Sequence, residues 1–176
     1  MPPRGGRVGP PPRSLGPVQG SVTVEVAAPP DRVWSLVSDV TAIGRFSPET
    51  FEAQWLDGAT GPAEGARFRG HVRRNGRGPT YWTTCKVTEC EPGRRFGFGV
   101  VTPAGKVLNT WRYELEATDG GTSLTESFAL SPTPLLRLYW LLAGWARGRA
   151  NVRGMTTTLA RVKAAAESEP GESAPA

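Results

Sequence analysis

Two alternating runs of residues on either side of an Asp-Gly-Gly sequence limit the folds open to this chain more than any other feature. Apolar and polar side chains alternate over residues 109–116 and again over residues 123–130. A period of two is typical of half-buried β-strands. The Asp119-Gly120 dipeptide between the runs is typical of a two-residue type I′ turn, which needs positive φ at both positions. The segment is therefore predicted to be an antiparallel β-hairpin.

The register of this hairpin places a carboxylate on the inner face. A two-residue loop pairs Thr118 with Gly121 and therefore Tyr113 with Glu126, whereas a slip by one residue would mix the polar and apolar faces. Glu126 is then expected to lie inward, diagonal to Trp111. A buried carboxylate is costly unless it is hydrogen-bonded, paired or hydrated. Either Glu126 has a partner, or the interior is hollow and holds water or a ligand.

The remaining segments predict a single α+β domain. The expected order is a first strand (21–28), a helix that begins at Pro29-Pro30, a short second helix or turn, six antiparallel strands (51–57, 66–74, 80–90, 94–101, 106–117 and 122–130) and a long C-terminal helix (134–166). Such a meander can curve around the amphipathic helix and enclose a cavity.

Both ends of the chain differ in composition from this domain. Residues 1–20 are rich in Pro, Gly and Arg and are expected to form a disordered arm, and residues 168–176 a disordered tail, so the folded domain spans 21–167. The first segment lacks the apolar core of a secretory signal, and no apolar run reaches the ~20 residues of a membrane span. A cytoplasmic protein is expected.

The formal charge of +5 raises the question of a nucleic-acid partner. In the strand at 66–74 the arginines alternate with apolar residues and are expected to face solvent, together with His71. The aromatic residues are expected to alternate inward instead of interleaving with these arginines. A solvated basic face is therefore expected, without nucleic-acid binding.

Neither a metal nor a cofactor is expected. His71 is the only histidine, and Cys85 and Cys90 lie an odd number of residues apart on one predicted strand. They are therefore expected to project to opposite faces, without a disulfide, and they do not supply a tetrahedral metal site. The sequence also lacks a Walker loop and a dinucleotide-binding fingerprint.

The predicted C-terminal helix carries one apolar stripe at a spacing of three and four residues. Its members are Leu141, Trp145, Gly148, Val152, Met155, Leu159, Val162 and Ala166. The start of the helix has more apolar residues than one stripe needs, among them Leu135, Tyr139 and Trp140. These are compatible with peripheral membrane contact, with a homodimer contact, or with a lid over the cavity.

The order of elements and several local sequences resemble the START-like, birch-pollen-allergen-like superfamily, which has the helix-grip fold. The sequences that carry the resemblance are "VEVAAPPDRVWSLVSDV" (24–40), "FSPE" (46–49), "GARFRGH" (65–71), "YWTTCKVTECEPGRRFGF" (81–98), "WRYELEATDGGTSLTES" (111–127) and "MTTTLARVKAAAE" (155–167). Within the superfamily the chain is similar to the polyketide cyclase/dehydrase and lipid-transport (SRPBCC) group common in actinobacteria. The resemblance implies a curved antiparallel sheet of about seven strands around a long C-terminal helix, with an internal cavity.

Three polar residues are the candidates for chemistry in this cavity. An apolar pocket would raise the pKa of Glu126 and suit it to proton transfer in the cyclisation or dehydration of a poly-β-ketone. Alternatively, its carboxylate bonds to Tyr113, Asn109 or water and supports the sheet. Asn109 would orient a ligand carbonyl or simply begin its strand, and Tyr81 would donate to a bound oxygen or lie at the rim with its hydroxyl in water.

The expected ligand is a hydrophobic or aromatic, polyketide-like small molecule held between sheet and helix. The wall is predicted to consist of Phe96, Phe98, Trp111, Tyr113, Leu124, Phe128, Trp145, Gly148, Val152 and Met155. Two other functions fit the same sequence. One is a non-catalytic lipid or isoprenoid carrier that works at a membrane, and the other is an interaction module, such as a chaperone co-activator, with a filled interior.

Overall fold

Seven strands form one antiparallel sheet in the order β1-β7-β6-β5-β4-β3-β2. The computed structural model describes residues 19–76, 78–131 and 134–168, with side chains described except at 75 and 134–147. The elements are β1 (Gln19–Val26), α1 (Pro30–Ser38), the 3₁₀ helix η1 (Val40–Arg45), β2 (Thr50–Trp55), β3 (Arg67–Arg73), the 3₁₀ turn η2 (Arg74–Gly76), β4 (Thr80–Glu91), β5 (Arg95–Val101), β6 (Val107–Thr118), β7 (Gly121–Leu130) and α2 (Pro134–Glu167). The predicted α+β helix-grip architecture is confirmed.

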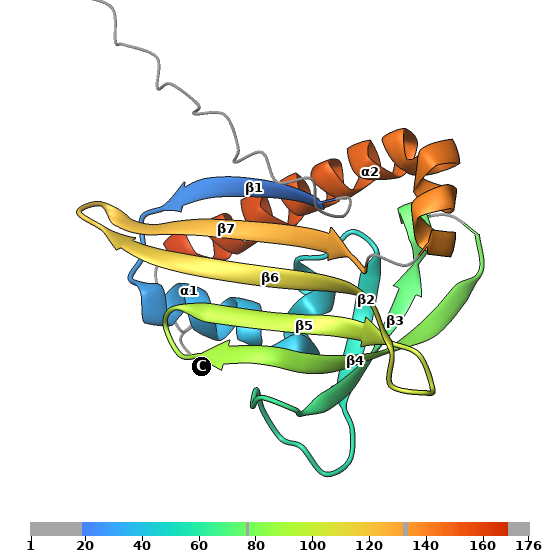
Figure 1. Ribbon diagram of the computed structural model, residues 1–176. Helices are drawn as coiled ribbons and strands as arrows, with labels where there is room; N and C mark the ends of the chain where they lie inside the picture. The colour runs from blue at the N-terminus through green and yellow to red at the C-terminus, as the bar shows by residue number, and fades with distance from the viewer. Residues whose placement is uncertain (1–18, 77, 132–133, 169–176) are drawn as a thin grey trace, which may run out of the picture.

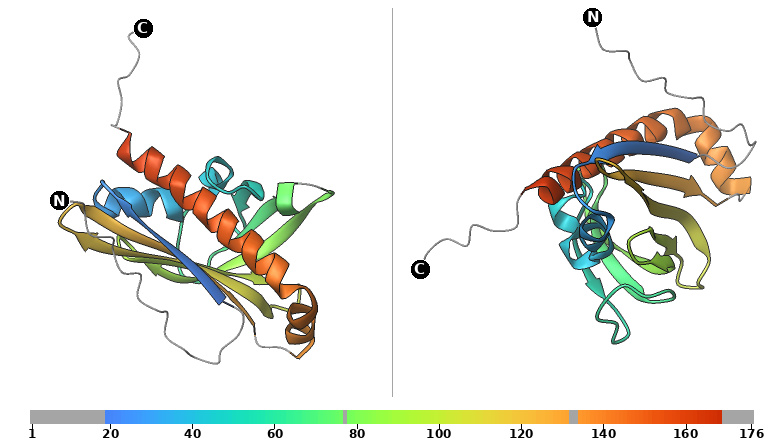
Figure 2. Two further views of the ribbon diagram at one scale, coloured as in Figure 1. Left: turned by 90° about the horizontal axis from the view of Figure 1, so that it is seen from above. Right: turned by 90° about the vertical axis from the view of Figure 1, so that its left-hand side faces the viewer.

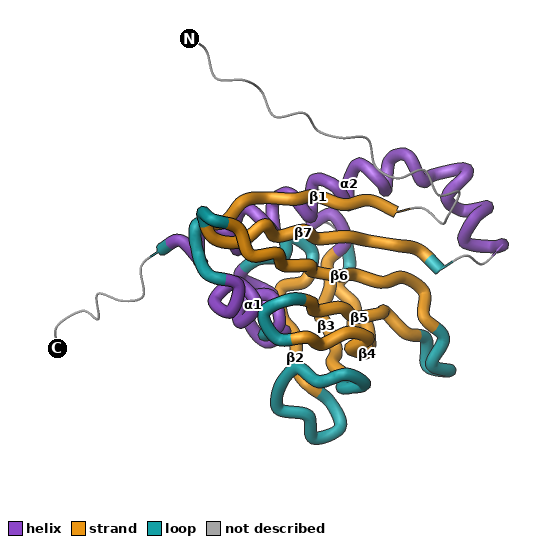
Figure 3. The backbone as a smooth tube through the Cα atoms, turned by 60° about the vertical axis from the view of Figure 1, so that its left-hand side comes forward, coloured by secondary structure: helices purple, strands orange, loops and turns teal. Residues whose placement is uncertain are grey.

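The helices α1, η1 and α2 cover one face of a strongly curved sheet. The strands change direction markedly between β5 and β2, so the sheet wraps around the helices (Figures 1 and 3). Helix α2 crosses the sheet on the side of β1 and β7, and α1 lies beside the C-terminal half of α2 (Figure 2). The face toward the helices is called the concave face below, and the opposite one the convex face.

The β6–β7 hairpin has the predicted register. Its pairs include Thr118 with Gly121, Leu115 with Leu124, Tyr113 with Glu126, and Trp111 with Phe128. The predicted turn type, however, is wrong. The positive φ of 136° occurs at Gly121 and not at Asp119 or Gly120. A Cβ at Gly121 would lie only 2.2 Å from the carbonyl oxygen of Val26, so the close approach of the β1–α1 connection requires glycine there.

Buried apolar side chains form two clusters. The larger one joins the concave face to α1 and the C-terminal half of α2, and its most buried members include Phe68, Phe96, Leu124 and Leu159. The smaller one is the contact of Phe128 on β7 with Met155 on α2. Among the described residues, the larger cluster therefore closes the core at the α1 end of the sheet, and the Phe128–Met155 contact lies farther along α2.

A β-bulge between Val87 and Glu89 corrects the prediction for the cysteines. Cys85 pairs with Val100 and Cys90 pairs with Phe96, and both partners lie on the concave face of β5. The extra residue in β4 reverses the alternation, so the two thiols share a face instead of projecting apart. Both are free cysteines, as expected.

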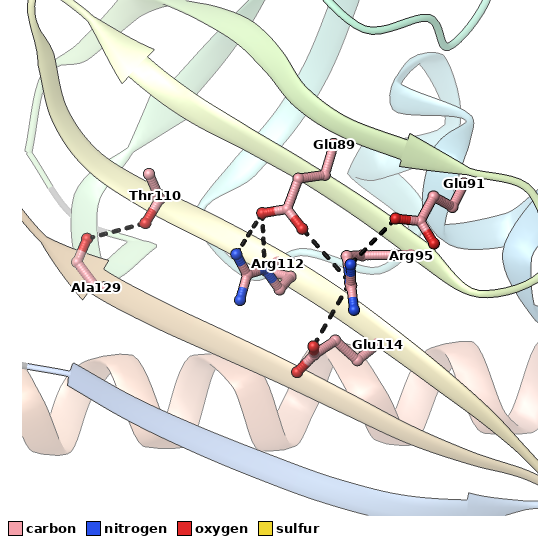
Figure 4. Close-up of polar contacts among 7 residues, drawn as sticks. All are labelled: Glu89, Glu91, Arg95, Thr110, Arg112, Glu114 and Ala129. Atoms are coloured by element: carbon pink, nitrogen blue, oxygen red, sulfur yellow. Dashed lines mark hydrogen bonds and ion pairs between the residues drawn. The ribbon is translucent and has the colours of Figure 1, made fainter. Parts of the chain in front are cut away.

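On the convex face, the same bulge directs Glu89 into a network of ion pairs (Figure 4). The carboxylate of Glu89 accepts from Arg112 Nε at 2.9 Å, and its other oxygen lies 3.4 Å from Arg95 Nε. Gly97 on β5 lies between Glu89 and Arg112 in the sheet, and its lack of a side chain lets the two meet across that strand. These side chains are partly exposed, so the network contributes little to stability.

Candidate ligand-binding site

A pocket of about 390 Å³ lies between the concave face, η1 and α2. Its apolar wall includes Ile43, Phe68, Val72, Phe98, Val100, Leu108, Trp111, Phe128, Leu130 and Met155. Members of both core clusters are among these residues, so the pocket borders both clusters. A filled interior, which the interaction-module hypothesis required, is not what the structure has.

Glu126 lies in the wall with only 3% of its surface exposed. The Tyr113 hydroxyl donates to its Oε1 at 3.1 Å, while Oε2 is buried and has no hydrogen-bond partner among the described residues. Of the partners predicted for this carboxyl, it is thus Tyr113 that binds it. Burial raises the pKa of Glu126 to about 7, although the Tyr113 hydrogen bond lowers it in part. The carboxyl therefore exists in both protonation states near neutral pH.

Tyr113 remains protonated beside this carboxyl. Burial raises the pKa of the Tyr113 hydroxyl well above its ordinary value, and the charge of Glu126 raises it further. The tyrosine therefore acts as a fixed hydrogen-bond donor on Oε1. The second oxygen of Glu126 is the one available for other chemistry.

Asn151 on α2 is a second buried polar group in the wall, and the sequence reasoning missed it. The side chain is 6% exposed, and its Nδ2 has no hydrogen-bond partner among the described residues. We expected Val152 to face inward, but it is 43% exposed. Asn151 lies four residues before Met155 and fits the same helical spacing. Its polarity excluded it from an apolar stripe, and a test for spacing alone would have found it.

The other polar candidates in the lining are less buried than Glu126. Tyr81 is 37% exposed and Asn109 is partly buried, and both belong to the lining. The guanidinium of Arg74, also in the lining, lies 6.0 Å from the centroid of the Tyr81 ring. Tyr81 therefore has the rim position that was one of its two predicted alternatives.

Most of the predicted wall residues with described side chains line the pocket. Those in the lining are Phe98, Trp111, Tyr113, Phe128 and Met155, together with Glu126, Asn109 and Tyr81. Phe96 and Leu124 face inward as predicted, but they are fully buried in the larger core cluster and outside the lining. They lie closer to the α1 end of the sheet, where helices cover it directly.

Two of the wall residues predicted on α2 lie outside the lining, and those predicted nearer its start are not described. Gly148 and Val152 are not among the lining residues. Val152 faces the β1 edge, where its Cγ2 would lie 3.8 Å from a Cβ at Gly20. Another predicted wall residue, Trp145, has a side chain outside the described residues. The same holds for Leu135, Tyr139 and Trp140, and therefore for the membrane, homodimer or lid contact predicted at the start of α2.

The convex face of β2, β3 and β4 carries the histidine. His71 stacks on Trp82 at a centroid distance of 4.4 Å, and its Nδ1 lies 3.4 Å from Glu52 Oε2. It is not a lining residue, in line with its expected outward direction.

The arginines on this face differ from expectation in one respect, because aromatic rings do interleave with them. The Cζ atom of Arg69 lies 4.5 Å from the centroid of the Trp82 ring, and that of Arg73 lies 5.8 Å from the centroid of the Phe51 ring. The guanidinium groups of these arginines therefore lie over aromatic rings on the last strands of the sheet.

Within the described part of the chain, no group of three or more His, Cys, Asp or Glu residues is arranged to hold a metal ion. No helix there has the length and apolar composition needed to cross a membrane.

A curved antiparallel sheet closed by a long helix over an internal pocket defines a protein of the helix-grip class. Comparison with known families narrows this class. Residues 17–167 match the family model described as polyketide cyclase / dehydrase and lipid transport, and the chain belongs to this family. None of the curated proteins compared with the chain matches it.

Solved structures agree with this assignment. The polyketide-cyclase-like protein Cgl2372 from Corynebacterium glutamicum is 30% identical, with a TM-score of 0.58 over 85% of this chain and 91% of that chain. The di-domain ARO/CYC StfQ of the steffimycin biosynthetic pathway is 17% identical, with a TM-score of 0.65 over 85% of this chain and 50% of that one. Protein CV1439 from Chromobacterium violaceum is 17% identical, with a TM-score of 0.61 over 87% of this chain and 100% of that one. The two more distant structures share the fold.

Proposed function

We propose that this protein binds a hydrophobic or aromatic, polyketide-like small molecule in the pocket between its sheet and α2. The observation that carries the proposal is a pocket of about 390 Å³ with a mainly apolar wall and a buried carboxyl, Glu126, inside it. Small-molecule sites combine an apolar wall of this kind with a few polar groups that set the orientation of the ligand. Membership of the polyketide cyclase / dehydrase and lipid transport family supports the same role.

Glu126 is the group through which such a site would perform acid–base chemistry. With a pKa of about 7, its carboxyl can take a proton from a carbon next to a ketone and return one to an oxygen. Cyclisation and dehydration of a poly-β-ketone both need these transfers. Asn109 and Tyr81 would hold the oxygen on which negative charge develops, and the apolar wall would keep the folded substrate in position.

Two measurements test this proposal. Mass spectrometry of small molecules extracted from the purified protein should find an apolar or aromatic compound in stoichiometric amount. With that compound or its precursor, Glu126→Gln should abolish turnover yet leave binding affinity nearly unchanged, because the amide keeps the shape but does not transfer protons. Turnover that survives in Glu126→Gln would refute a catalytic role for this residue.

A non-catalytic lipid carrier is the second candidate, favoured by the lipid transport in the family description. A carrier should move a fluorescent lipid between vesicles without changing it. Replacing Tyr139 and Trp140 by serine should slow this transfer if the start of α2 contacts the membrane. Unchanged transfer in that variant, with turnover detected on an extracted compound, would favour the enzyme.

A further inference from the structure

Glu126 and Asn151 place two unpartnered polar atoms in one pocket, on opposite walls. Oε2 of Glu126 projects from β7 and Nδ2 of Asn151 from α2, and neither has a hydrogen-bond partner among the described residues. Both side chains are more than nine-tenths buried. A buried polar atom without a partner costs stability, so a pair of them in one cavity indicates groups kept for a ligand.

The two atoms lie at different depths along the pocket. Phe128 on β7 packs on Met155 of α2, which aligns the two elements. Glu126 lies two residues from Phe128 toward the closed end, where Leu124 belongs to the main core. Asn151 lies one helical turn before Met155, toward the start of α2. The two polar groups are therefore on opposite sides of the Phe128–Met155 contact.

The chemistry of each atom limits what it can recognise. The amide nitrogen of Asn151 only donates, so its partner on a ligand is an acceptor such as a carbonyl oxygen. Oε2 of Glu126 accepts when the carboxyl is ionised and donates or accepts when it is protonated. A hydroxyl group suits both forms, because it is itself both donor and acceptor. A ligand carboxylate at the same position would be repelled whenever Glu126 is ionised.

We infer that Glu126 and Asn151 select an elongated, neutral, largely aromatic ligand that has a hydroxyl at its inner end and a carbonyl oxygen farther out. This inference rests on the proposed function, since it names the ligand class of the same pocket. Hydroxylated aromatic ketones and quinones meet the requirement. Fatty acids do not, because their only polar group is an anion.

Three tricyclic probes of similar shape test the inference by fluorescence or calorimetric titration. 2-Hydroxyanthraquinone carries both groups, anthraquinone lacks the hydroxyl, and 2-hydroxyanthracene lacks the carbonyls. The wild-type protein should bind the first at least about fivefold more tightly than either of the others, since each missing group leaves one buried polar atom unpaired. This comparison requires no variant and holds even if a substitution prevents folding.

Two variants assign each preference to its residue. Glu126→Met should remove the preference for the hydroxyl and keep that for the carbonyl, whereas Asn151→Leu should do the reverse. Circular dichroism and the melting temperature show that each variant is folded. A variant that weakens all three probes equally would show a packing role only and overturn the inference.

The outcomes also separate the inference from the function on which it rests. Equal, tight binding of all three probes to the wild type would leave an apolar ligand-binding site in place and overturn the selection by Glu126 and Asn151. Failure of all three probes, together with the absence of any compound in extracts of the protein, would overturn both.

Discussion

The hydroxyl of Tyr113 donates a hydrogen bond to Oε1 of Glu126 over 3.1 Å, between directly paired residues of β6 and β7. This contact satisfies one oxygen of the carboxyl and leaves Oε2 in the pocket wall without a partner among the described residues. The tyrosine thus partly stabilises the charged form of a carboxyl that burial otherwise keeps protonated.

Replacing Tyr113 by phenylalanine should raise the pKa of Glu126 above its value of about 7, because the hydrogen bond that lowers it is lost while the burial remains. Carbon-13 NMR of the labelled glutamate carboxyl measures this directly across the pH range. Tyr81→Phe is the matched control, since Tyr81 lies at the rim and is 37% exposed. An unchanged or lowered pKa in Tyr113→Phe would contradict the assigned role.

The stability of the protein should depend on pH through Glu126. Burial raises the pKa of this carboxyl from 4.5 to about 7, so between these values the folded state holds a proton that the unfolded chain releases. The free energy of unfolding should therefore fall by about 3 kcal/mol as the pH rises through this window and change no further at higher pH. Urea denaturation from pH 4 to 9 measures it.

The amide variant provides the control for this pH dependence. Glu126→Gln carries no titrating group, so its stability should lack the Glu126 component of the slope and exceed that of the wild type at pH 8. Equal slopes in the two proteins would mean that Glu126 does not titrate in this range.

Gly121→Ala should destabilise the protein by at least ~1–3 kcal/mol, because Gly121 has a φ of 136° and a new Cβ would lie 2.2 Å from the Val26 carbonyl oxygen. Gly120→Ala is the control one residue away. A Cβ at Gly120 meets nothing within 4 Å, and its φ is not positive, so little change is expected. Melting temperatures of the two variants should differ clearly. Similar values would refute the close contact at Gly121.

Two positions on α2 test which face of the helix is buried. Leu159 is fully buried in the main core, so Leu159→Ala should cost ~2–5 kcal/mol. Val152 is 43% exposed, and Val152→Ala should cost less than ~0.5 kcal/mol. Denaturant titration of both variants gives these values. A large loss of stability in Val152→Ala would contradict the exposed position and show that Val152 is buried, as the apolar stripe in the sequence predicted.

Local rules were sufficient for the hairpin and for the inward direction of Glu126. A turn of two residues and a side-chain period of two leave one register that separates polar from apolar faces, and the observed pairs have that register. The rest of the sheet and the extent of α2 also followed from periodicity and from the positions of glycine and proline. The turn type did not, because the approach of Val26 decides which glycine takes the positive φ.

The chain by itself therefore determined the elements, their order and most of the strand residues that face the interior. Only the tertiary structure decided which inward residues meet a helix and which meet the pocket, and so separated Leu124 from Phe128 on the same face of β7. It also decided that Cys90 shares a face with Cys85, because the alternation of side chains in the sequence does not reveal the β-bulge between them. Asn151 is a further case. Helical spacing places it on the same face as Met155, but only the packing of α2 on β7 shows that this face lines the pocket that contains Glu126, because contacts between elements distant in sequence do not follow from the polarity of one residue.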